Sequence, residues 1–354
     1  MSRAWIDIDL GALRRNGAAI ARHAAVPLLP MVKADAYGLG ALATVRALEP
    51  LDPWGYGVAT VAEGCALRAA GVGREILVFT PLLPADFPGA LAARLTPVLG
   101  DPAAIAQWSE SPAPWHLGID TGMGRAGVRW DRVAEIAHLV AAAPPAGACT
   151  HFHTAIDAGS VRQQRERFDA AVSALPVRPR MLHAENGPAV EHLAGPSAFD
   201  VVRPGIFLYG VGSGHGARIT PEPVVHVRAR VVEVRELRAG DVVSYDATWR
   251  APGPRRIATL AIGYADGYRR ALSNRGVVLL NGARVSVAGV VTMDMTMVDA
   301  TSAPCVPGDV ATLIGDGGGE HLSLADVAER AQLSPYELLT GLRARMPRLY
   351  REAA

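Results

Sequence analysis

The sequence is poor in cysteine. Only Cys65, Cys149 and Cys305 occur among its 354 residues. They are odd in number and far apart, so they fit neither a disulfide framework nor the ligand spacing of a zinc site. This use of cysteine is typical of a reducing compartment, and we expect the chain to work in the cytoplasm.

Long apolar runs and a large net charge are also absent. Half of the residues are hydrophobic, but proline, glycine and charged residues interrupt each apolar stretch before it reaches the length of a membrane span. The segment 1–16 alternates like a strand and has no apolar core of a signal peptide. The net charge of +1 creates no field that would attract nucleic acid or an anionic membrane. We therefore expect neither as a partner.

Short strand-like runs alternate with helical patterns through the first part of the chain. The runs are 29–32, 54–60, 74–80, 95–100, 114–120, 147–152, 178–184 and 199–205, and helical patterns lie between them at 39–50, 61–71, 130–143 and 161–175. Such alternation implies a parallel sheet, and eight units predict an α/β fold of the (β/α)8 or TIM barrel type. Two of the intervening helices have weak patterns, so a doubly wound sheet stays an alternative.

The pattern changes from about residue 222 onwards. Strand-like segments separated by Gly and Pro turns lie at 224–237, 240–245, 256–264, 276–280, 283–291 and 308–316, which is typical of a mostly-β domain. Two helix starts follow, because Ser323 and Ser334 each offer an N-cap with an acidic residue in the first turn. We predict a barrel domain over residues 1–221 and a smaller, β-rich C-terminal domain over residues 222–354.

Several polar residues stand at or just past the ends of the expected strands. They are Lys33, Arg125, His151, Asn186 and Arg203. In a (β/α)8 barrel the chemistry lies at the C-terminal ends of the strands, so these side chains should share one mouth. Each taken alone is more often structural, as when a lysine at a strand end extends its amine to solvent. Their convergence favours a site, in which the lysine forms a Schiff base.

The loops after the seventh and eighth strands match the usual phosphate site of such barrels. They read Asn186-Gly187-Pro188 and Arg203-Pro204-Gly205-Ile206, and their glycines let backbone N–H groups approach a phosphate closely. A Schiff-base lysine, a phosphate site and an arginine together indicate pyridoxal 5′-phosphate (PLP) as the cofactor.

The sequence also resembles the PLP-dependent alanine racemase family (fold type III) over nearly its whole length. The motifs that carry the resemblance are VKADAYGLG (32–40), GVATVAEGCALR (57–68), LGIDTGMGRAGV (117–128), THF (150–152), HAENGPA (183–189), VRPGIFLYG (202–210), VSYDATW (243–249), IGYADGY (262–268) and VTMDMTMVD (291–299), with PYELLTGLRARMPRLY near the end. So many separate motifs in one order make coincidence a poor explanation.

The resemblance implies a role for each matching residue. Lys33 would hold PLP and act as one proton-transfer base, and Tyr245 would be the opposite base, supplied by the partner subunit of a homodimer. The cofactor-binding residues besides Lys33 would be Tyr37, His151, Asn186, Gly187, Arg203, Gly205 and Ile206, and the substrate-binding residues would be Arg125, Met293 and Tyr264. The implied reaction is the interconversion of L- and D-alanine, which provides a cell wall precursor.

These residue types suit the chemistry of racemisation. The reaction removes the Cα proton on one face and returns a proton on the other, so two bases on opposite faces serve it directly. A free tyrosine has a pKa near 10 and needs nearby positive charge, which His151 and Arg203 could supply, to act as a base. An arginine does not give up its proton. At the pyridine nitrogen it would leave that nitrogen unprotonated, which weakens the electron sink and favours quick return of the proton.

The sequence departs from the pattern of the family at a few positions. Gly118 stands where many members carry a carbamylated lysine, so another group, such as a bound chloride ion, would have to position Arg125. The other departures are Gly187 in place of a serine, Ala344 in place of a tyrosine near the substrate methyl group, Thr292 where cysteine is common and Asp246 where glycine is common. Because the pocket is altered, alanine is the leading substrate and a larger or polar amino acid such as serine is the alternative.

Three other interpretations compete with a racemase. A non-catalytic PLP-binding protein would need neither Tyr245 nor a β-rich domain, and a decarboxylase of this barrel class would place an acid where Arg203 stands. Residues 38–43 match the G-x-G-x-x-A pattern of dinucleotide-binding proteins, but the acid expected about twenty positions later is missing from a strand end. The pair His151 and His153 has no third ligand at a plausible spacing, so no metal is predicted.

Overall fold

The computed structural model describes residues 2–352 of the chain and divides it into two compact units. The barrel unit comprises residues 13–36 and 41–222. The β unit comprises the chain up to Ala12, the short segment Tyr37–Gly40 and the chain from Pro223 onwards. The division at Glu222/Pro223 lies one residue from the expected boundary, whereas the N-terminal residues, expected in the barrel domain, group with the β unit.

Six parallel strands form most of the sheet of the barrel unit. In spatial order they are β2 (Gly55–Val58), β3 (Glu75–Val78), β4 (Thr96–Leu99), β5 (His116–Asp120), β7 (Gly147–Cys149) and β8 (Met181–His183), and the short β6 (Val128–Arg129) pairs with β5. Most of their residues are buried, as expected for parallel strands that are covered on both faces.

Two further extended runs close this sheet into a ring. Isolated parallel bridges join Leu28 to Val202, Met31 to Gly57 and Asn186 to Arg203. The backbone N–H of Leu29 donates to Val202 O at 2.8 Å, and that of Val32 donates to Gly57 O at 2.9 Å. The runs near residues 28–32 and 201–203 therefore stand as the first and eighth strands. This closure confirms the predicted (β/α)8 barrel and excludes the doubly wound alternative.

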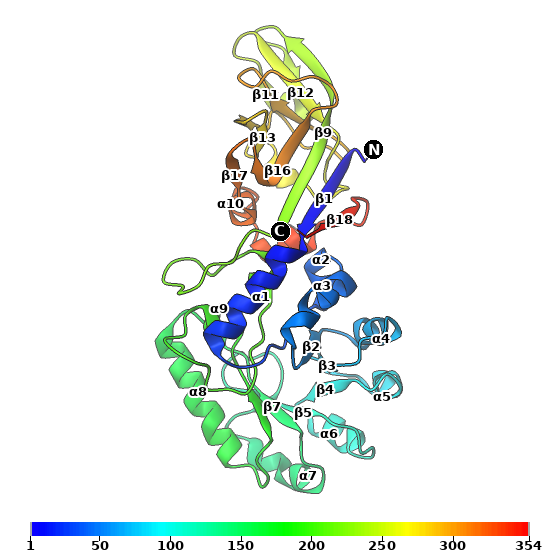
Figure 1. Ribbon diagram of the computed structural model, residues 1–354, viewed down its shortest axis with the longest axis vertical. Helices are drawn as coiled ribbons and strands as arrows, with labels where there is room; N and C mark the ends of the chain where they lie inside the picture. The colour runs from blue at the N-terminus through cyan, green and yellow to red at the C-terminus, as the bar shows by residue number, and fades with distance from the viewer. Residues whose placement is uncertain (1, 353–354) are drawn as a thin grey trace. The chain divides into compact units, whose positions relative to one another are not determined.

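Helices occupy the connections between the strands. They are α1 (Leu10–Ala24), α2 (Lys33–Gly38), α3 (Ala41–Leu48), α4 (Val61–Ala69), α5 (Phe87–Ala92), α6 (Pro102–Trp108), α7 (Ala137–Ala142), α8 (Ala158–Ser173) and α9 (Gly187–Glu191), with 3-10 turns η1 (Glu49–Leu51), η2 (Pro84–Asp86), η3 (Val133–Ile136) and η4 (Ile206–Tyr209). Figure 1 shows α3 to α6 on the outer side of β2 to β5. Inside the ring, Leu29, Leu77 and Val201 form a fully buried cluster.

The β unit is built on one large sheet. Its main path runs β14 (Ala283–Ser286), β13 (Val277–Leu280), β16 (Val310–Gly317), β9 (Val225–Leu237), β1 (Ala4–Asp9) and β18 (Arg348–Arg351). The strands β12 (Arg255–Leu260), β15 (Thr296–Asp299) and β17 (Glu320–Leu322) branch from this path, and β10 (Val242–Val243) and β11 (Trp249–Arg250) pair separately. Figure 1 shows the long β9 beside β1. The predicted mostly-β character of this region is confirmed.

Short helical segments complete the β unit. They are η5 (Tyr245–Ala247), η6 (Arg270–Leu272), α10 (Leu324–Arg330) and α11 (Pro335–Thr340). The two predicted helix starts are confirmed, because Ser323 Oγ accepts from Asp326 N at 3.0 Å and Ser334 Oγ accepts from Glu337 N at 3.3 Å. Both caps are full capping boxes, which satisfy backbone N–H groups that have no partner within a helix.

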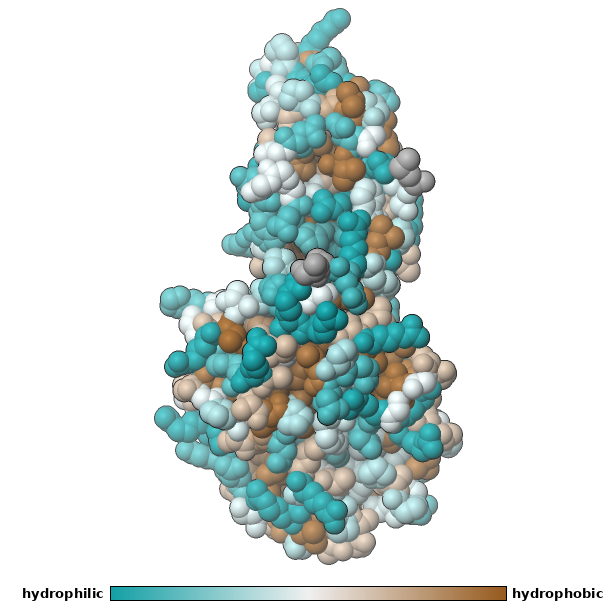
Figure 2. Space-filling model, in the orientation of Figure 1, coloured by the Kyte–Doolittle hydropathy of each residue, from teal (hydrophilic) through white to brown (hydrophobic). Residues whose placement is uncertain are grey.

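No helix described within residues 2–352 could cross a membrane. None of the helices described there combines the length and the apolar character that a crossing needs. The face drawn in Figure 2 mixes hydrophilic and hydrophobic residues.

Candidate active site

A cavity of about 380 Å³ opens in the barrel unit, where strands β4, β5 and β7 end. Lys33, Arg125, His151 and Arg203 all line it, from four separate strand ends and loops. Four of the five polar residues predicted to share one mouth thus border the same space. The fifth, Asn186, contacts one of them, because its Nδ2 lies 3.4 Å from His151 Nε2.

Lys33 follows the first strand run directly and is half-buried. Burial lowers the pKa of its amine, and the positive charges of Arg125 and Arg203 act in the same direction, while Glu63 opposes them. A lowered pKa enlarges the neutral fraction of the amine, which is the form that attacks a carbonyl group. The amine therefore borders a cavity with other positive charges. The alternative, a structural lysine that extends its amine to solvent, fits this position less well.

The segment after Lys33 adopts an unusual backbone conformation. Ala34, Asp35, Ala36 and Tyr37 have φ angles of 52°, 53°, 53° and 58°, so α2 is a left-handed turn made by non-glycine residues. Such a conformation costs about 1–2 kcal/mol for each residue and persists only where surrounding contacts fix it. In the barrel unit, Ala34 N donates to Glu63 Oε1 at 2.8 Å, and Ala41 N donates to Asp35 Oδ1 at 2.7 Å.

Arg203 is buried and held rigidly. Its Nη1 donates to His183 Nδ1 at 2.9 Å, and its Nη2 donates to the carbonyl oxygens of Thr150 at 2.7 Å and Ala184 at 2.9 Å. The side chain is 4% exposed. Because several acceptors fix the planar guanidinium, the cavity contains a positive charge with a fixed orientation.

Two histidines behind Arg203 extend this arrangement into the barrel interior. His183 Nε2 lies 2.9 Å from His116 Nδ1. Burial, together with the charge of Arg203, lowers the pKa of His116 to about 4 and holds the pKa of His183 well below its ordinary value. Both rings are therefore neutral at pH 7. Since Arg203 donates to Nδ1 of His183, the proton of that ring lies on Nε2 and is donated to His116.

The sequence prediction missed this pair of histidines. His116 begins β5 and His183 ends β8, and both are buried next to apolar residues of their strands. A polar residue in a buried strand was the available signal.

His151 lies closer to the cavity and is also neutral. Burial lowers its pKa to about 3, and the charges of Arg203, Arg125 and Lys33 contribute in that order. Its Nδ1 lies 3.5 Å from Arg203 Nη2, which is at the outer limit of a hydrogen bond. His151 and Arg203, expected together to supply positive charge, thus contact each other, but the ring of His151 is neutral and the shorter contact of this arginine is to His183.

The residues predicted to hold a phosphate are divided between the units. In the barrel unit, a Cβ built on Gly187 would lie 3.8 Å from Gly205 N, so the two loops approach closely. Ile206 begins η4, where backbone N–H groups have no partner within the helical turn. Tyr37 belongs to the β unit, is 6% exposed, and places its ring 6.1 Å from that of Tyr336.

The predicted second base Tyr245 and the predicted substrate-binding residues Met293 and Tyr264 all belong to the β unit. Tyr245, Met293 and Tyr264 are 67%, 52% and 41% exposed. The loops that carry Tyr264 and Met293 are joined by backbone hydrogen bonds of 3.0 Å, from Tyr264 N to Thr292 O and from Ala265 N to Met293 O. These two side chains are therefore presented by one joined pair of loops.

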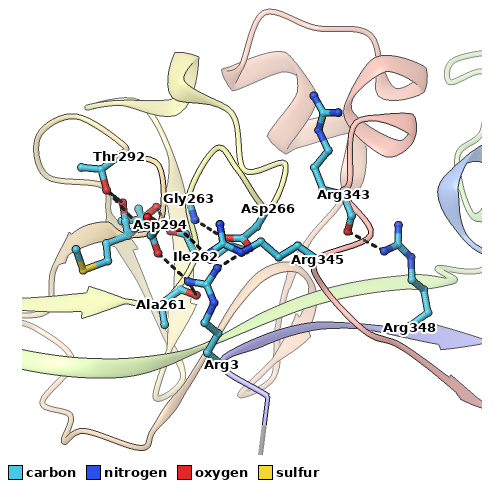
Figure 3. A network of polar contacts seen from close by, with 12 residues as sticks. Arg3, Ala261, Ile262, Gly263, Asp266, Thr292, Asp294, Arg343, Arg345 and Arg348 are labelled. Atoms are coloured by element: carbon cyan, nitrogen blue, oxygen red, sulfur yellow. Dashed lines mark hydrogen bonds and ion pairs between the residues drawn. The ribbon is translucent and has the colours of Figure 1, made fainter.

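A buried carboxylate supports this pair of loops, as Figure 3 shows. Asp266 Oδ2 accepts from Gly263 N at 3.0 Å, and its Oδ1 accepts from Arg3 Nη2 at 2.8 Å. Arg345 Nη2 donates to Asp294 Oδ1 at 2.6 Å, and Arg3 Nη1 donates to Asp294 O at 3.1 Å. The loops thus depend on Arg3 from the N-terminus and Arg345 from near the C-terminus. Sequence reasoning missed these supports, since nothing in the local pattern pairs residues so far apart.

The donor set of the cavity fits an anionic cofactor. The ionisable residues that line it include three bases, Lys33, Arg125 and Arg203, and one acid, Asp120. The Asp120 carboxylate also accepts from Gly122 N and Gly124 N at 2.9 and 3.1 Å. These backbone N–H groups partly offset its negative charge. A phosphate-bearing aldehyde and an amino-acid carboxylate both suit this excess of positive charge.

Two models of known families match the chain. The alanine racemase N-terminal domain covers residues 8–213, and the alanine racemase C-terminal domain covers residues 224–350. The alanine racemases of Nostoc sp. and Deinococcus radiodurans are 35% and 37% identical to it, over 98% of this chain and over 95% and 99% of their own lengths.

Solved structures agree with these matches. The structure of alanine racemase from Bartonella henselae, described with covalently bound pyridoxal phosphate, has a TM-score of 0.91 at 30% identity, covering 99% of this chain and 100% of that one. Alanine racemase from Streptomyces lavendulae, which produces D-cycloserine, has a TM-score of 0.92 at 30% identity, covering 100% and 98%.

A barrel with a lysine at its mouth, followed by a β-rich domain, is the architecture of a barrel-type PLP enzyme. The matches to known proteins cover both of these domains. The chain belongs to the alanine racemase family, as its motifs predict. It is thus an isomerase that depends on PLP, and the predicted enzyme class and cofactor are confirmed.

Proposed function

We propose that the chain interconverts L- and D-alanine, with PLP attached to Lys33 and with Lys33 and Tyr245 as the two proton-transfer bases. The observation that carries the proposal is the single cavity that Lys33, Arg125, His151 and Arg203 share. When bound, PLP supplies the electron sink that makes the Cα proton of an amino acid acidic. The residues of the chain hold the cofactor, orient the substrate and move the proton.

Lys33 and Arg203 would divide the work inside the barrel. The lowered pKa of Lys33 suits an amine that takes up and returns a proton. Arg203 keeps its proton and is fixed by His183 and two carbonyl oxygens, so it would donate to the pyridine nitrogen without protonating it. A ring nitrogen that stays unprotonated favours return of the proton over decarboxylation, which supports a racemase against that rival.

The phosphate of PLP would lie at the loops of Gly187 and Gly205. Their close approach leaves backbone N–H groups near one another without a Cβ between them. Ile206 N would add a donor at the start of η4, and the Tyr37 hydroxyl would add another. Asn186 would support this loop through its cap, because its Oδ1 accepts from Ala189 N at 3.2 Å while its Nδ2 reaches His151.

We infer a homodimer in which each active site draws on both chains. Tyr245, Tyr264, Met293 and Met295 are exposed by 41–67% on the β unit, and large apolar side chains at such exposure are typical of a protein interface. In the dimer, Tyr245 would be the second base, the backbone N–H of Met293 would meet the substrate carboxylate, and Tyr264 would border the entrance. Arg125 of the cavity's own chain would meet the same carboxylate.

A second candidate substrate is serine or another amino acid larger than alanine. Gly118 lines the cavity where a longer side chain is common in the family, and Ala344 stands in place of a tyrosine. Both replacements remove side-chain volume. Chloride or a similar anion would then position Arg125. The excess of positive charge in the cavity would attract such an anion.

The test is a single assay on the purified protein loaded with PLP. A panel of L-amino acids is incubated in D2O, and chirality and Cα deuterium are read together. We expect D-alanine to form fastest, with one deuterium in each product molecule. A faster D-serine product would favour the second candidate, and exchange without inversion would contradict Tyr245 as a base.

The expected cellular setting follows from the same proposal. Three free thiols are compatible with a reducing cytoplasm, and D-alanine formed there would serve as a cell wall precursor. Fractionation of cells that express the tagged chain would test the compartment.

A further inference from the structure

The carboxylate of Glu63 joins two backbone segments that border the cavity. Its Oε2 accepts from Ala59 N at 2.7 Å and from Thr60 N at 3.2 Å, which closes the capping box at the start of α4. Its Oε1 leaves that box and accepts from Ala34 N at 2.8 Å. Lys33 and Ala59, which lie beside these donors, both line the cavity. A helix cap alone would need only the first set of contacts.

We propose that Glu63 is a positioning residue for Lys33: it anchors the first N–H of the left-handed turn and thereby aims the amine at the cofactor site. Ala34 is the first of four consecutive non-glycine residues with positive φ, and it follows Lys33 directly. The strain of this turn has to be offset by contacts at its beginning, and the Glu63 carboxylate is the acceptor there. The proposal rests on the proposed function, because it takes Lys33 as the PLP-bearing residue.

An amide cannot replace this carboxylate. Three N–H donors converge on the two oxygens of Glu63. Glutamine has one oxygen, so its NH2 group would face either Ala34 N or the pair Ala59 and Thr60. The negative charge also matters to the amine, since Glu63 opposes the effect of Arg125 and Arg203 on it. Glu63→Gln therefore removes the charge and cannot satisfy the anchor and the helix cap together, with almost no change in volume.

Thr60 offers a matched control in the same capping box. Its Oγ1 accepts from Glu63 N at 3.3 Å, and it has no part in the contact to Ala34. Thr60→Ala removes a cap hydrogen bond of α4, which costs about 1 kcal/mol of stability, and leaves the anchor of the turn in place. Glu63→Asp is a second variant, because the shorter side chain can still cap α4 but does not extend to Ala34.

The experiment measures attachment of PLP without any substrate. The full-length wild type and the three variants, freed of cofactor, are mixed with PLP, and the absorbance of lysine-bound PLP is followed in time. Borohydride reduction and peptide mass spectrometry then locate the attached group, and thermal unfolding of each protein reports stability. We expect Glu63→Gln and Glu63→Asp to attach PLP to Lys33 about tenfold more slowly or worse, as for loss of one hydrogen bond to a charged acceptor.

Thr60→Ala should attach PLP at the wild-type rate while its unfolding temperature falls. Equal rates in wild type and both Glu63 variants would overturn the positioning role, as would an equal slowing in Thr60→Ala, since Glu63 would then act only as a helix cap. A wild-type chain that forms no linkage to Lys33 would instead overturn the proposed function, and this inference with it.

Discussion

Arg203 Nη1 donates to His183 Nδ1 over 2.9 Å, and both side chains are buried in the barrel unit. The bond ties the positive charge of the cavity to a neutral ring that in turn meets His116. His183 and His116, which hold Arg203 from the barrel interior, carry no charge at pH 7. The positive charge at the cavity therefore comes from Lys33, Arg125 and Arg203.

Replacement of Lys33 by alanine should abolish cofactor attachment. Without the amine no covalent bond to PLP can form, and one proton-transfer base is lost, so racemisation should fall by a factor of about 10² to 10⁴ or more. Visible absorbance of the purified protein and a chirality assay measure the two effects. An unchanged spectrum with normal turnover would contradict the role of Lys33.

Replacement of Tyr245 by phenylalanine should spare the spectrum of bound PLP and remove racemisation by a factor of about 10² to 10⁴. Loss of one exposed hydroxyl should leave stability nearly unchanged, because the side chain is 67% exposed. Normal racemisation by this variant would mean that another group is the second base.

Mixing these two inactive variants tests the shared active site. In a Lys33→Ala/Tyr245→Phe mixed dimer, one site would carry both substitutions and the other would carry neither, so activity should return after subunit exchange. Each variant alone, taken through the same exchange, is the control. Failure of mixed samples to regain activity, with exchange verified by mass, would contradict a site built from two chains.

Stability should decline as the pH falls below about 6.5. His116 and His151 have pKa values lowered by burial to about 4 and about 3, whereas in the unfolded chain each titrates near 6.5. Between these limits the unfolded state binds more protons than the folded state. Each residue should therefore lower the free energy of unfolding by about 1.4 kcal/mol for each unit by which the pH falls. Urea unfolding from pH 7.5 to 5 measures this slope. His116→Gln should show a shallower slope, while His153→Ala, at an exposed site, should match the wild type.

Asp266→Asn should loosen the loops that present Tyr264 and Met293. The buried carboxylate accepts from Arg3 and from Gly263 N, and an amide leaves part of this set unsatisfied, which costs about 1–3 kcal/mol. We expect a lower unfolding temperature together with a raised KM for the substrate. Asp294→Asn, whose carboxylate is half exposed, is the milder comparison. A lower unfolding temperature without any change in KM would limit Asp266 to a structural role.

Asp246→Gly should stabilise the chain. Asp246 has a φ of 60° within η5, where glycine is common in the family, and the position is exposed. Glycine adopts this conformation without steric cost, so we expect a gain of up to about 1 kcal/mol in the free energy of unfolding. Asp246→Ala should bring no such gain, and an equal gain in both variants would mean that strain at φ is not the cause.

The barrel was predictable because its strands are buried on both faces and therefore appear as short apolar runs. Once the runs were placed, their ends located Lys33 and His151. The left-handed turn was not predictable, since alanine at 34 and 36 carries no signal for positive φ; contacts such as that of Glu63 impose it from outside. His116 and His183 could not be paired from the sequence, because 67 positions separate them and the contact depends on how β5 and β8 lie on either side of β7.

The position of β1 has a consequence for how the chain matures as it is made. Among the described strands β1 is synthesised first, yet its two neighbours are β9 and β18, the latter at residues 348–351. Residues 10–351 must be synthesised before both edges of β1 are paired. The barrel unit can fold during this interval, while backbone N–H and C=O groups of β1 remain unpaired. Synthesis that halts before β18 would therefore leave one edge of β1 unpaired. An unpaired strand edge favours aggregation and binding by chaperones.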